Sequence, residues 1–184
     1  MRRSCTLKAD HDRTLLLTKS GAPMKPSNSA LYLRDEELDG GTELLLLAHR
    51  DLFLAIDGAL TTLALGRAHF RALFFIGRRP GCPVNDLIKL LGITKQSLNR
   101  VLQGLLSSEL VSLSPGRRDR RQRLLALTPK GLELMQQLAR LQRQRVAQAY
   151  REAGPEAVNG FRKVMSGLLN ERNRLTTLIE GTRE

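Results

Sequence analysis

The sequence has no tryptophan, two cysteines, three histidines and few other aromatic residues, and each shortage excludes a class of protein. Phe, Trp and Tyr make up 4% of the 184 residues, which favours a core of aliphatic side chains packed between helices. Cys5 and Cys82 are too few for a disulfide framework, have no metal-site spacing and fit a reducing compartment. His11, His49 and His69 are too scattered to predict a metal site.

The chain also lacks the patterns of a membrane span, a secretion signal and a catalytic site. No apolar run is longer than Leu44–Ala48, far short of the roughly 20 residues that cross a bilayer. The first residues lack the apolar core of a signal peptide, so we expect a cytoplasmic protein. There is no glycine-rich phosphate loop, no pair of carboxylates on one helix face and no nucleophile beside a base motif. We therefore expect neither an enzyme nor a bound cofactor.

Positive charge is abundant and concentrated in one part of the chain. The whole sequence has a formal net charge of +12. Residues 66–131 hold thirteen Lys and Arg against three Asp and Glu, a net charge of +10, whereas residues 42–65 have a net charge of −2. Such a concentration is typical of a surface that binds a polyanion. A membrane-binding surface is the alternative, but it would combine basic residues with exposed bulky apolar groups rather than gather them on a hairpin.

A helix with one polar face is predicted to begin after Thr94, whose hydroxyl can accept a first-turn amide. From Leu98 to Leu105, apolar residues recur at intervals of three and four and form the opposite face. The polar face has no acidic residue and carries side chains that hydrogen-bond base edges and phosphates. An ordinary solvated face is the alternative for this helix taken alone. The predicted DNA contacts of this helix are Thr94, Lys95, Gln96, Ser97, Asn99, Arg100 and Gln103.

Two apolar runs of strand length, Leu110–Leu113 and Gln122–Leu127, flank a turn that is rich in arginine. Pro115-Gly116 favours a turn, and the segment Ser114–Arg123 holds five arginines and one aspartate. Arginines on a projecting hairpin can enter the narrow minor groove of DNA, where the negative potential is strongest. A helix followed by a hairpin with a basic tip predicts a winged helix-turn-helix. The predicted DNA contacts of this wing are Arg117, Arg118, Arg120 and Arg121.

The segment Asp119–Gly131, DRRQRLLALTPKG, resembles the wing signature of the MarR family of transcription regulators, with its Asp-x-Arg and Leu-Thr-x-x-Gly elements. The stretches GRAHFRALFFI and GITKQSLNRVL resemble, more narrowly, the PetP-type members of that family. The resemblance extends from about Leu31 to the C-terminus. It implies that Asp119 braces the wing rather than contacting DNA.

Two residues stand out against this pattern. Glu109 occupies a position where the family commonly has glycine, so we expect a less sharply defined end of the helix before the first wing strand. Gly104 lies inside the predicted recognition helix, where glycine costs about 1 kcal/mol relative to alanine. We expect Gly104 to permit a close backbone approach.

The predicted fold is mainly α-helical: a winged helix-turn-helix with a two-stranded wing hairpin, plus long dimerisation helices. Residues 1–30 lack a periodic apolar face and are predicted to form a poorly ordered tail. Residues 66–131 form the DNA-binding domain, and residues 31–65 and 132–184 form the dimerisation region. Within it we expect helices over Thr42–Leu65, ended by Gly66, over Pro129–Glu152, and over Glu156–Glu180.

The helix expected over Thr42–Leu65 is apolar on nearly all sides, so it must be covered by more than its own domain. The stretch Gly40-Gly41 before it is read as a break or a tolerated irregularity, and Gly154-Pro155 as the break between the last two helices. A second subunit is the expected cover, and a bundle within a monomer is the alternative.

A small-molecule site is also predicted. Members of the family often bind small anionic or aromatic effectors where the dimer helices meet the reading head, and cationic donors suit a carboxylate or phenolate. Cys82 could act as a redox sensor only if its thiolate is stabilised, and a bystander thiol is the alternative. The residues on the helices that would line the effector crevice are His49, Arg50, Arg67 and His69; satisfied surface or interface residues are the alternative for them.

Taken together, the sequence predicts a homodimeric regulator that binds a pseudo-palindromic site in double-stranded DNA, with repression as the default outcome. The alternative from another class is a winged-helix module for protein assembly or RNA binding, without sequence-specific operators. Gln96, Asn99 and Arg100 favour base reading, because an assembly module would not need them.

Overall fold

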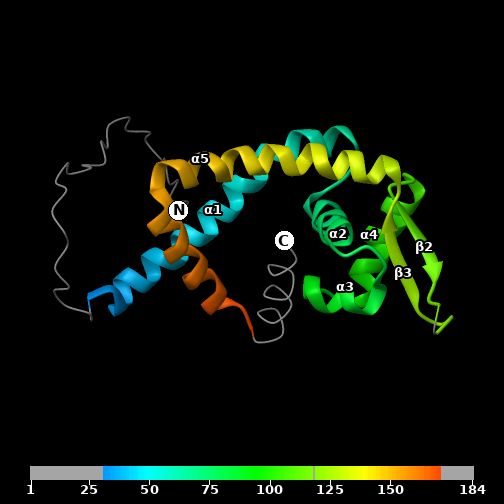
Figure 1. Ribbon diagram of the computed structural model, residues 1–184, viewed down its shortest axis with the longest axis horizontal. Helices are drawn as coiled ribbons and strands as arrows, with labels where there is room; N and C mark the ends of the chain where they lie inside the picture. The colour runs from blue at the N-terminus through cyan, green and yellow to red at the C-terminus, as the bar shows by residue number, and fades with distance from the viewer. Residues whose placement is uncertain (1–30, 118, 171–184) are drawn as a thin grey trace, which may run out of the picture. The chain divides into compact units, whose positions relative to one another are not determined.

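The computed structural model describes residues 31–117 and 119–170 (Figure 1). The predicted tail at residues 1–30, the wing residue Arg118 and residues 171–184 lie outside the described residues. The described chain is mainly helical with one small antiparallel sheet, which confirms the predicted fold class. None of the described helices is both long enough and apolar enough to cross a bilayer.

The chain divides into two units, residues 1–42 and 43–184. The described part of the first unit is a short 3-10 helix, η1 (Leu31–Leu33), and the first turns of α1 (Asp35–Thr62). Acidic residues fill the first turn of α1, where they complement the positive end of the helix dipole. The predicted start at Thr42 is therefore wrong, because the helix already begins at Asp35. It continues through Gly40-Gly41 without a break.

The C-terminal end of α1 also differs from the prediction, because the helix stops at Thr62 rather than at Gly66. Ala64 adopts a left-handed conformation with φ of 52°, and the amide of Leu65 donates to the carbonyl of Leu60 at 2.9 Å. These features are those of a Schellman motif, a common way for a helix to end, and its two apolar residues, Leu60 and Leu65, are both buried. Gly66 has an extended backbone and instead precedes the next helix.

Three helices form the compact head of the second unit: α2 (Arg67–Arg78), α3 (Val84–Leu91) and α4 (Lys95–Ser107). Their apolar faces meet in one core with Ile56 and Leu60 of α1 and Leu138 of α5 (Pro129–Leu168). The apolar face predicted for the recognition helix is buried, as expected. Its buried residues are Leu98, Val101, Leu102 and Leu105.

The sheet has three strands, β1 (Cys82–Pro83), β2 (Val111–Pro115) and β3 (Arg123–Leu127), in the order β1-β3-β2. β2 and β3 form the predicted hairpin, with Leu113 opposite Leu125. β1 was not predicted from the sequence. A strand of two residues in a Pro-Gly-rich turn has no periodicity of its own, and it exists because it pairs with β3.

α5 follows the wing and starts as predicted. The hydroxyl of Thr128 accepts a hydrogen bond from the amide of Gly131 at 3.0 Å, and a proline occupies the first turn. Gly154 has φ of 79° and ψ of 167°, which kinks the helix where the break was expected. Beyond the kink the helix ends at Leu168, and residues 171–180 of the predicted helix lie outside the described residues.

The end of α4 is sharper than expected. Glu109 has φ of 57°, the left-handed conformation that glycine adopts most easily. The amide of Leu110 donates to the carbonyl of Leu105 at 2.9 Å, and the Glu109 amide donates to that of Leu106 at 3.0 Å. These two hydrogen bonds define the helix end that usually has glycine in the left-handed position, so here glutamate forms the same turn. The expectation of a less defined helix end is therefore wrong.

Glu109→Gly is expected to raise the free energy of unfolding by about 0.5–1 kcal/mol. In the folded state, glycine would remove the strain of a left-handed backbone at a residue that carries a side chain. In the unfolded state, it would add backbone freedom, which offsets part of that gain in stability. Chemical denaturation of both proteins gives the comparison. Glu133→Gly, at an exposed position in the regular helix α5, is the control and should lose about 1 kcal/mol. A loss of stability in Glu109→Gly would show that the side chain has an interaction that outweighs backbone strain.

Candidate nucleic-acid interface

The start of α4 is fixed by two hydroxyl groups. Thr94 accepts a hydrogen bond from the amide of Ser97 at 3.1 Å and donates one to the Ser97 hydroxyl at 2.9 Å. Capping satisfies an amide that has no partner inside the helix. These two predicted DNA contacts therefore also hold the first turn of α4 in place.

The remaining predicted residues of α4 lie on its solvent-exposed face, opposite the buried leucines. The side chains on this face present amide and cationic groups without a carboxylate among them, which suits both base edges and phosphates. The exposed residues are Lys95, Gln96, Asn99, Arg100 and Gln103.

A groove of about 750 Å³ lies beside this face. Three of the predicted α4 residues and Arg121 of the wing line it, so the structure brings helix and wing residues to one surface. Ser97, Gln96 and Arg100 are not among the lining residues. The polar groove residues that were not predicted from the sequence are Asn85, Asp86 and Lys89 of α3 and Gln122 and Arg123 of the wing.

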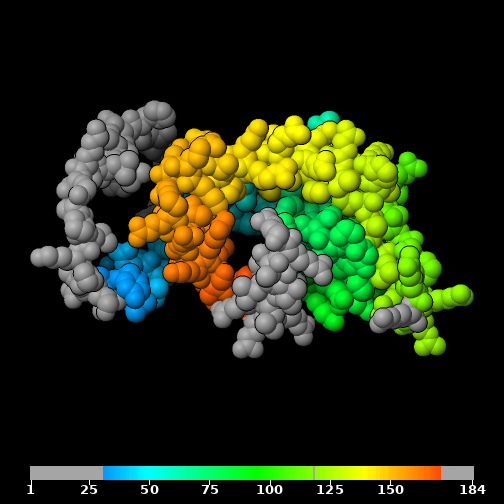
Figure 2. Space-filling model, in the orientation of Figure 1, coloured from blue at the N-terminus to red at the C-terminus, as the bar shows by residue number. Residues whose placement is uncertain are grey.

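The wing hairpin extends away from the helical head in Figure 1, and its tip projects from the molecular surface in Figure 2. The carboxylate of Asp119 accepts a hydrogen bond from the backbone amide of Arg121 at 2.9 Å. The amide of Gln122 donates to the Asp119 carbonyl at 3.0 Å, and that of Gly116 donates to the Gln122 carbonyl at 2.9 Å. Asp119 thus closes the turn through the backbone, while the side chains of Arg117, Arg120 and Arg121 are exposed.

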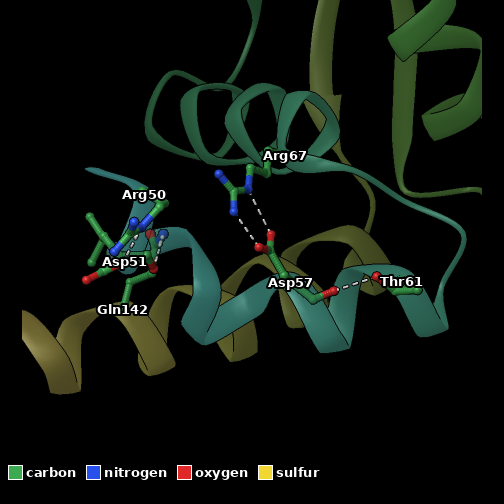
Figure 3. A network of polar contacts seen from close by, with 7 residues as sticks. Arg50, Asp51, Asp57, Thr61, Arg67 and Gln142 are labelled. Carbon is green, nitrogen blue, oxygen red and sulfur yellow. Dashed lines mark hydrogen bonds and ion pairs between the residues drawn. The ribbon is translucent and has the colours of Figure 1, made fainter. Parts of the chain in front are cut away.

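Two of the four predicted effector residues lie together. The ring of His49 is 5.0 Å from that of Phe53, and the guanidinium carbon of Arg67 is 5.3 Å from the same Phe53 ring. Arg67 also donates two hydrogen bonds to Asp57, from Nε at 2.9 Å and from Nη2 at 2.5 Å (Figure 3). The hydrogen bond from Arg67 lowers the pKa of Asp57.

The other two effector candidates face elsewhere. Arg50 pairs with Asp51 at 2.7 Å on the exposed surface of α1 (Figure 3). The ring of His69 lies against Gly104 of α4, where a β-carbon would be 2.9 Å from Nε2. A close approach is therefore present at Gly104, but a side chain makes it rather than the backbone that was expected. Arg50, Arg67 and His69 each have a polar partner within the chain, as the alternative of satisfied surface residues expects. The effector site itself remains a prediction.

Cys82 lies in β1 with a side chain that is buried. Burial raises the pKa of its thiol, Asp86 raises it further, and Arg79 lowers it by less. A raised pKa favours the protonated thiol, whereas redox sensing requires a stabilised thiolate. The structure supports the alternative, a bystander thiol.

Comparison with known proteins identifies relatives of this chain. The family model described as "MarR family" matches residues 65–122. A relative from Rhodobacter capsulatus, named HTH-type transcriptional regulator PetP, is 45% identical over 158 residues. That alignment covers 86% of this chain and 94% of the relative.

Two solved structures share the fold. A crystal structure of an E. coli MarR mutant complexed with operator DNA matches with a TM-score of 0.59 at 22% identity, over 76% of this chain and 99% of that one. The crystal structure of NadR in complex with 4-hydroxyphenylacetate matches with a TM-score of 0.61 at 20% identity, over 67% of this chain and 88% of that one.

Proposed function

Because this chain belongs to the MarR family of transcriptional regulators, we propose that it acts as a homodimer on a pseudo-palindromic operator in duplex DNA. The observation that carries the proposal is the groove in which the acid-free face of α4 meets Arg121 of the wing. A protein seated on a promoter excludes polymerase, so repression is the expected outcome. Its relatives are regulators of transcription, and the chain is not an enzyme.

Two grooves of DNA suit the two basic elements. The major groove admits an α-helix and displays a distinct hydrogen-bonding pattern for each base pair, so α4 would read sequence there. The wing would reach the flanking minor groove, where arginine reads width and potential. The E. coli MarR mutant, which has the same fold, is complexed with operator DNA, and this supports duplex DNA as the ligand.

The test is fluorescence anisotropy with labelled 40-base-pair duplexes that tile the DNA upstream of the protein's own gene. One duplex should bind more tightly than a shuffled duplex of equal composition, by a factor of about 10³ or more. Arg140→Ala, an exposed arginine on α5 outside the groove, is the control and should leave the ratio unchanged. Equal binding to all duplexes, or preference for RNA, would favour the alternative of an assembly or RNA-binding module.

The homodimer is proposed from apolar surface that the chain leaves exposed in the second unit. Leu44 and Leu46 of α1 are 69% and 68% exposed, and Val164 and Leu168 of α5 are each 62% exposed. Soluble monomers rarely expose so many large apolar side chains. A second copy of the chain would bury them, which agrees with the expectation that a helix apolar on nearly all sides is covered by a second subunit.

Light scattering is expected to give about twice the chain mass of 20.6 kDa at micromolar concentration. The double variant Val164→Glu/Leu168→Glu should shift the protein toward monomer, because the two side chains lie one turn apart on α5 and each carboxylate would be buried in the interface without a partner. Gln136→Glu adds a charge on a polar face of α5 and should leave the mass unchanged. A wild-type monomer that still binds DNA tightly would contradict the dimer.

A small aromatic carboxylate or phenolate is the proposed effector. The support is NadR, a fold relative bound to 4-hydroxyphenylacetate, together with the guanidinium of Arg67 and the ring of His49 beside Phe53. A ligand that binds the folded state at 100 times its Kd stabilises it by about 2.7 kcal/mol. Thermal unfolding with 4-hydroxyphenylacetate should therefore show a rise that Arg67→Gln reduces. An equal rise in both proteins would place the ligand elsewhere.

A further inference from the structure

One histidine links the first turn of α2 to the proposed recognition helix. Nδ1 of His69 accepts a hydrogen bond from the amide of Gly66 at 3.0 Å, and the His69 amide donates to the Gly66 carbonyl at 2.9 Å. The bond from the Gly66 amide to the ring is one half of a capping box, and it holds the ring at the start of α2. The far edge of the same ring reaches α4.

The contact on α4 depends on a glycine. A β-carbon at Gly104 would lie 2.9 Å from Nε2 and 3.5 Å from Cδ2 of His69, so any other residue would have to displace the ring. Glycine inside a helix is unfavourable, and this contact gives it a reason. Gly104 follows Gln103, a groove residue, and precedes the buried Leu105. The ring therefore sets how closely the groove-lining part of α4 approaches α2.

Only the neutral ring fits this position. The Nδ1 lone pair is used by the Gly66 amide, so the neutral ring carries its hydrogen on Nε2. A second hydrogen on Nδ1 would set two donors against each other and add positive charge at a helix N-terminus. The charged residues next along α2 are Arg67 and Arg71, and the one a turn before Gly104 on α4 is Arg100; all three are cationic. The carboxylate of Asp57 on α1 is already bound by Arg67. Burial lowers the pKa of His69.

We propose that His69 is a positioning residue for DNA recognition: its neutral ring, held by Gly66 and seated at Gly104, keeps α4 in the orientation that reads DNA. This rests on the proposed function, in which α4 enters the major groove. Protonation of the ring then releases α4 and weakens operator binding as pH falls. The general electrostatic effect runs the other way, because added positive charge strengthens phosphate binding.

The first test compares the pH dependence of binding in wild type and His69→Asn, using the tightest of the 40-base-pair promoter duplexes. Asparagine can place an oxygen near the position of Nδ1 and accept from Gly66, but it does not titrate. Between pH of about 7.5 and about 5.5, on either side of the ordinary histidine pKa, wild-type affinity should fall about tenfold. The variant lacks the ring edge that lies against Gly104, so it should bind more weakly than wild type at the higher pH, and its affinity should not fall further at the lower one.

The second test is a double-mutant cycle at the contact. Gly104→Ala should weaken binding about tenfold at the higher pH, because the added carbon displaces the ring, while its unfolding temperature should change little, because the cost of overpacking offsets the gain in helix propensity. In a His69→Ala background the same substitution should change affinity by less than about twofold, because the ring is no longer there. Gly160→Ala, where no atom lies within 4 Å of the added carbon, is the control and should leave affinity unchanged.

A third readout needs no DNA. Hydrogen exchange of the α4 amides, measured on the free protein, should speed up on acidification in wild type more than in His69→Asn. If no promoter duplex binds the wild type at either pH, the proposed function fails, while this readout still tests the contact. If wild type binds DNA but His69→Asn has the same pH profile, or Gly104→Ala costs as much without the histidine ring, the role of His69 is overturned.

Discussion

The Gly131→Ala variant is expected to lose about 3 kcal/mol or more of its free energy of unfolding. A β-carbon at position 131 would lie 1.9 Å from the carbonyl oxygen of Leu110 and 2.8 Å from its carbonyl carbon. Both partners are backbone, so no side chain can rotate out of the way. The start of α5 would have to separate from the start of β2.

The bonds around Gly131 would be lost together. The hydroxyl of Thr128 accepts from the Gly131 amide at 3.0 Å and donates to the carbonyl of Glu109 at 2.7 Å. The amide of Thr128 donates to the Leu110 carbonyl at 3.1 Å. The Leu-Thr-x-x-Gly element is thus a clamp that joins the end of α4, the start of the wing and the start of α5. Its loss leaves several polar groups without partners, which adds to the steric cost.

Urea denaturation followed by circular dichroism measures the loss. Gly167→Ala is the matched control, because nothing lies within 4 Å of the added carbon and alanine favours helix. The control should hold or gain stability. A loss below about 1 kcal/mol in Gly131→Ala would mean that the two backbones separate easily, and that the clamp contributes little to the fold.

Local patterns predicted the parts of the fold that depend on residues close in sequence. The apolar period of α4, its Thr94 cap and the Gly154 kink all lie within single elements, and the structure has each of them. The ends of α1 were wrong for a local reason. Three acidic residues, Asp35, Glu36 and Glu37, form the first turn of the helix. The left-handed conformation of Ala64 follows the end of the helix, and no residue type in the sequence predicts it.

Contacts between distant residues could not be read from the sequence. Gly104 was expected to allow a close approach, yet its partner His69 lies on another helix and was assigned to an effector crevice. β1 exists only through its pairing with β3. Resemblance flagged Gly131, but the Leu110 carbonyl that explains it belongs to a different element.

The candidate DNA surface shows the same division. The concentration of charge in residues 66–131 and the acid-free face of α4 identified the module. The lining of the groove by Asn85 and Lys89 of α3 depends on how three helices pack, which no periodicity records. Sequence therefore predicts which elements carry the chemistry, and packing decides which side chains share one surface.

Removing side chains from the recognition helix and removing them from the wing are expected to weaken DNA binding in two different ways. Asn99→Ala or Arg100→Ala should reduce the ratio of operator to shuffled-duplex affinity by about 5- to 150-fold, because a good pair of hydrogen bonds to a base edge discriminates by ~1–3 kcal/mol. Both side chains are exposed on α4, so removing them leaves the buried face intact. Asn99 lines the groove directly.

Arg121→Ala should instead weaken binding to operator and shuffled duplex by comparable factors and reduce the slope of log affinity against log salt by about one. The amide of Arg121, which Asp119 binds, remains in this variant, so the turn of the wing is preserved while the charge is removed. A salt titration of both duplexes with each variant measures the two effects, with Arg140→Ala as the control for loss of an arginine outside the groove. If Arg121→Ala lost only specificity while Asn99→Ala and Arg100→Ala weakened both duplexes equally, the roles of wing and helix would be exchanged.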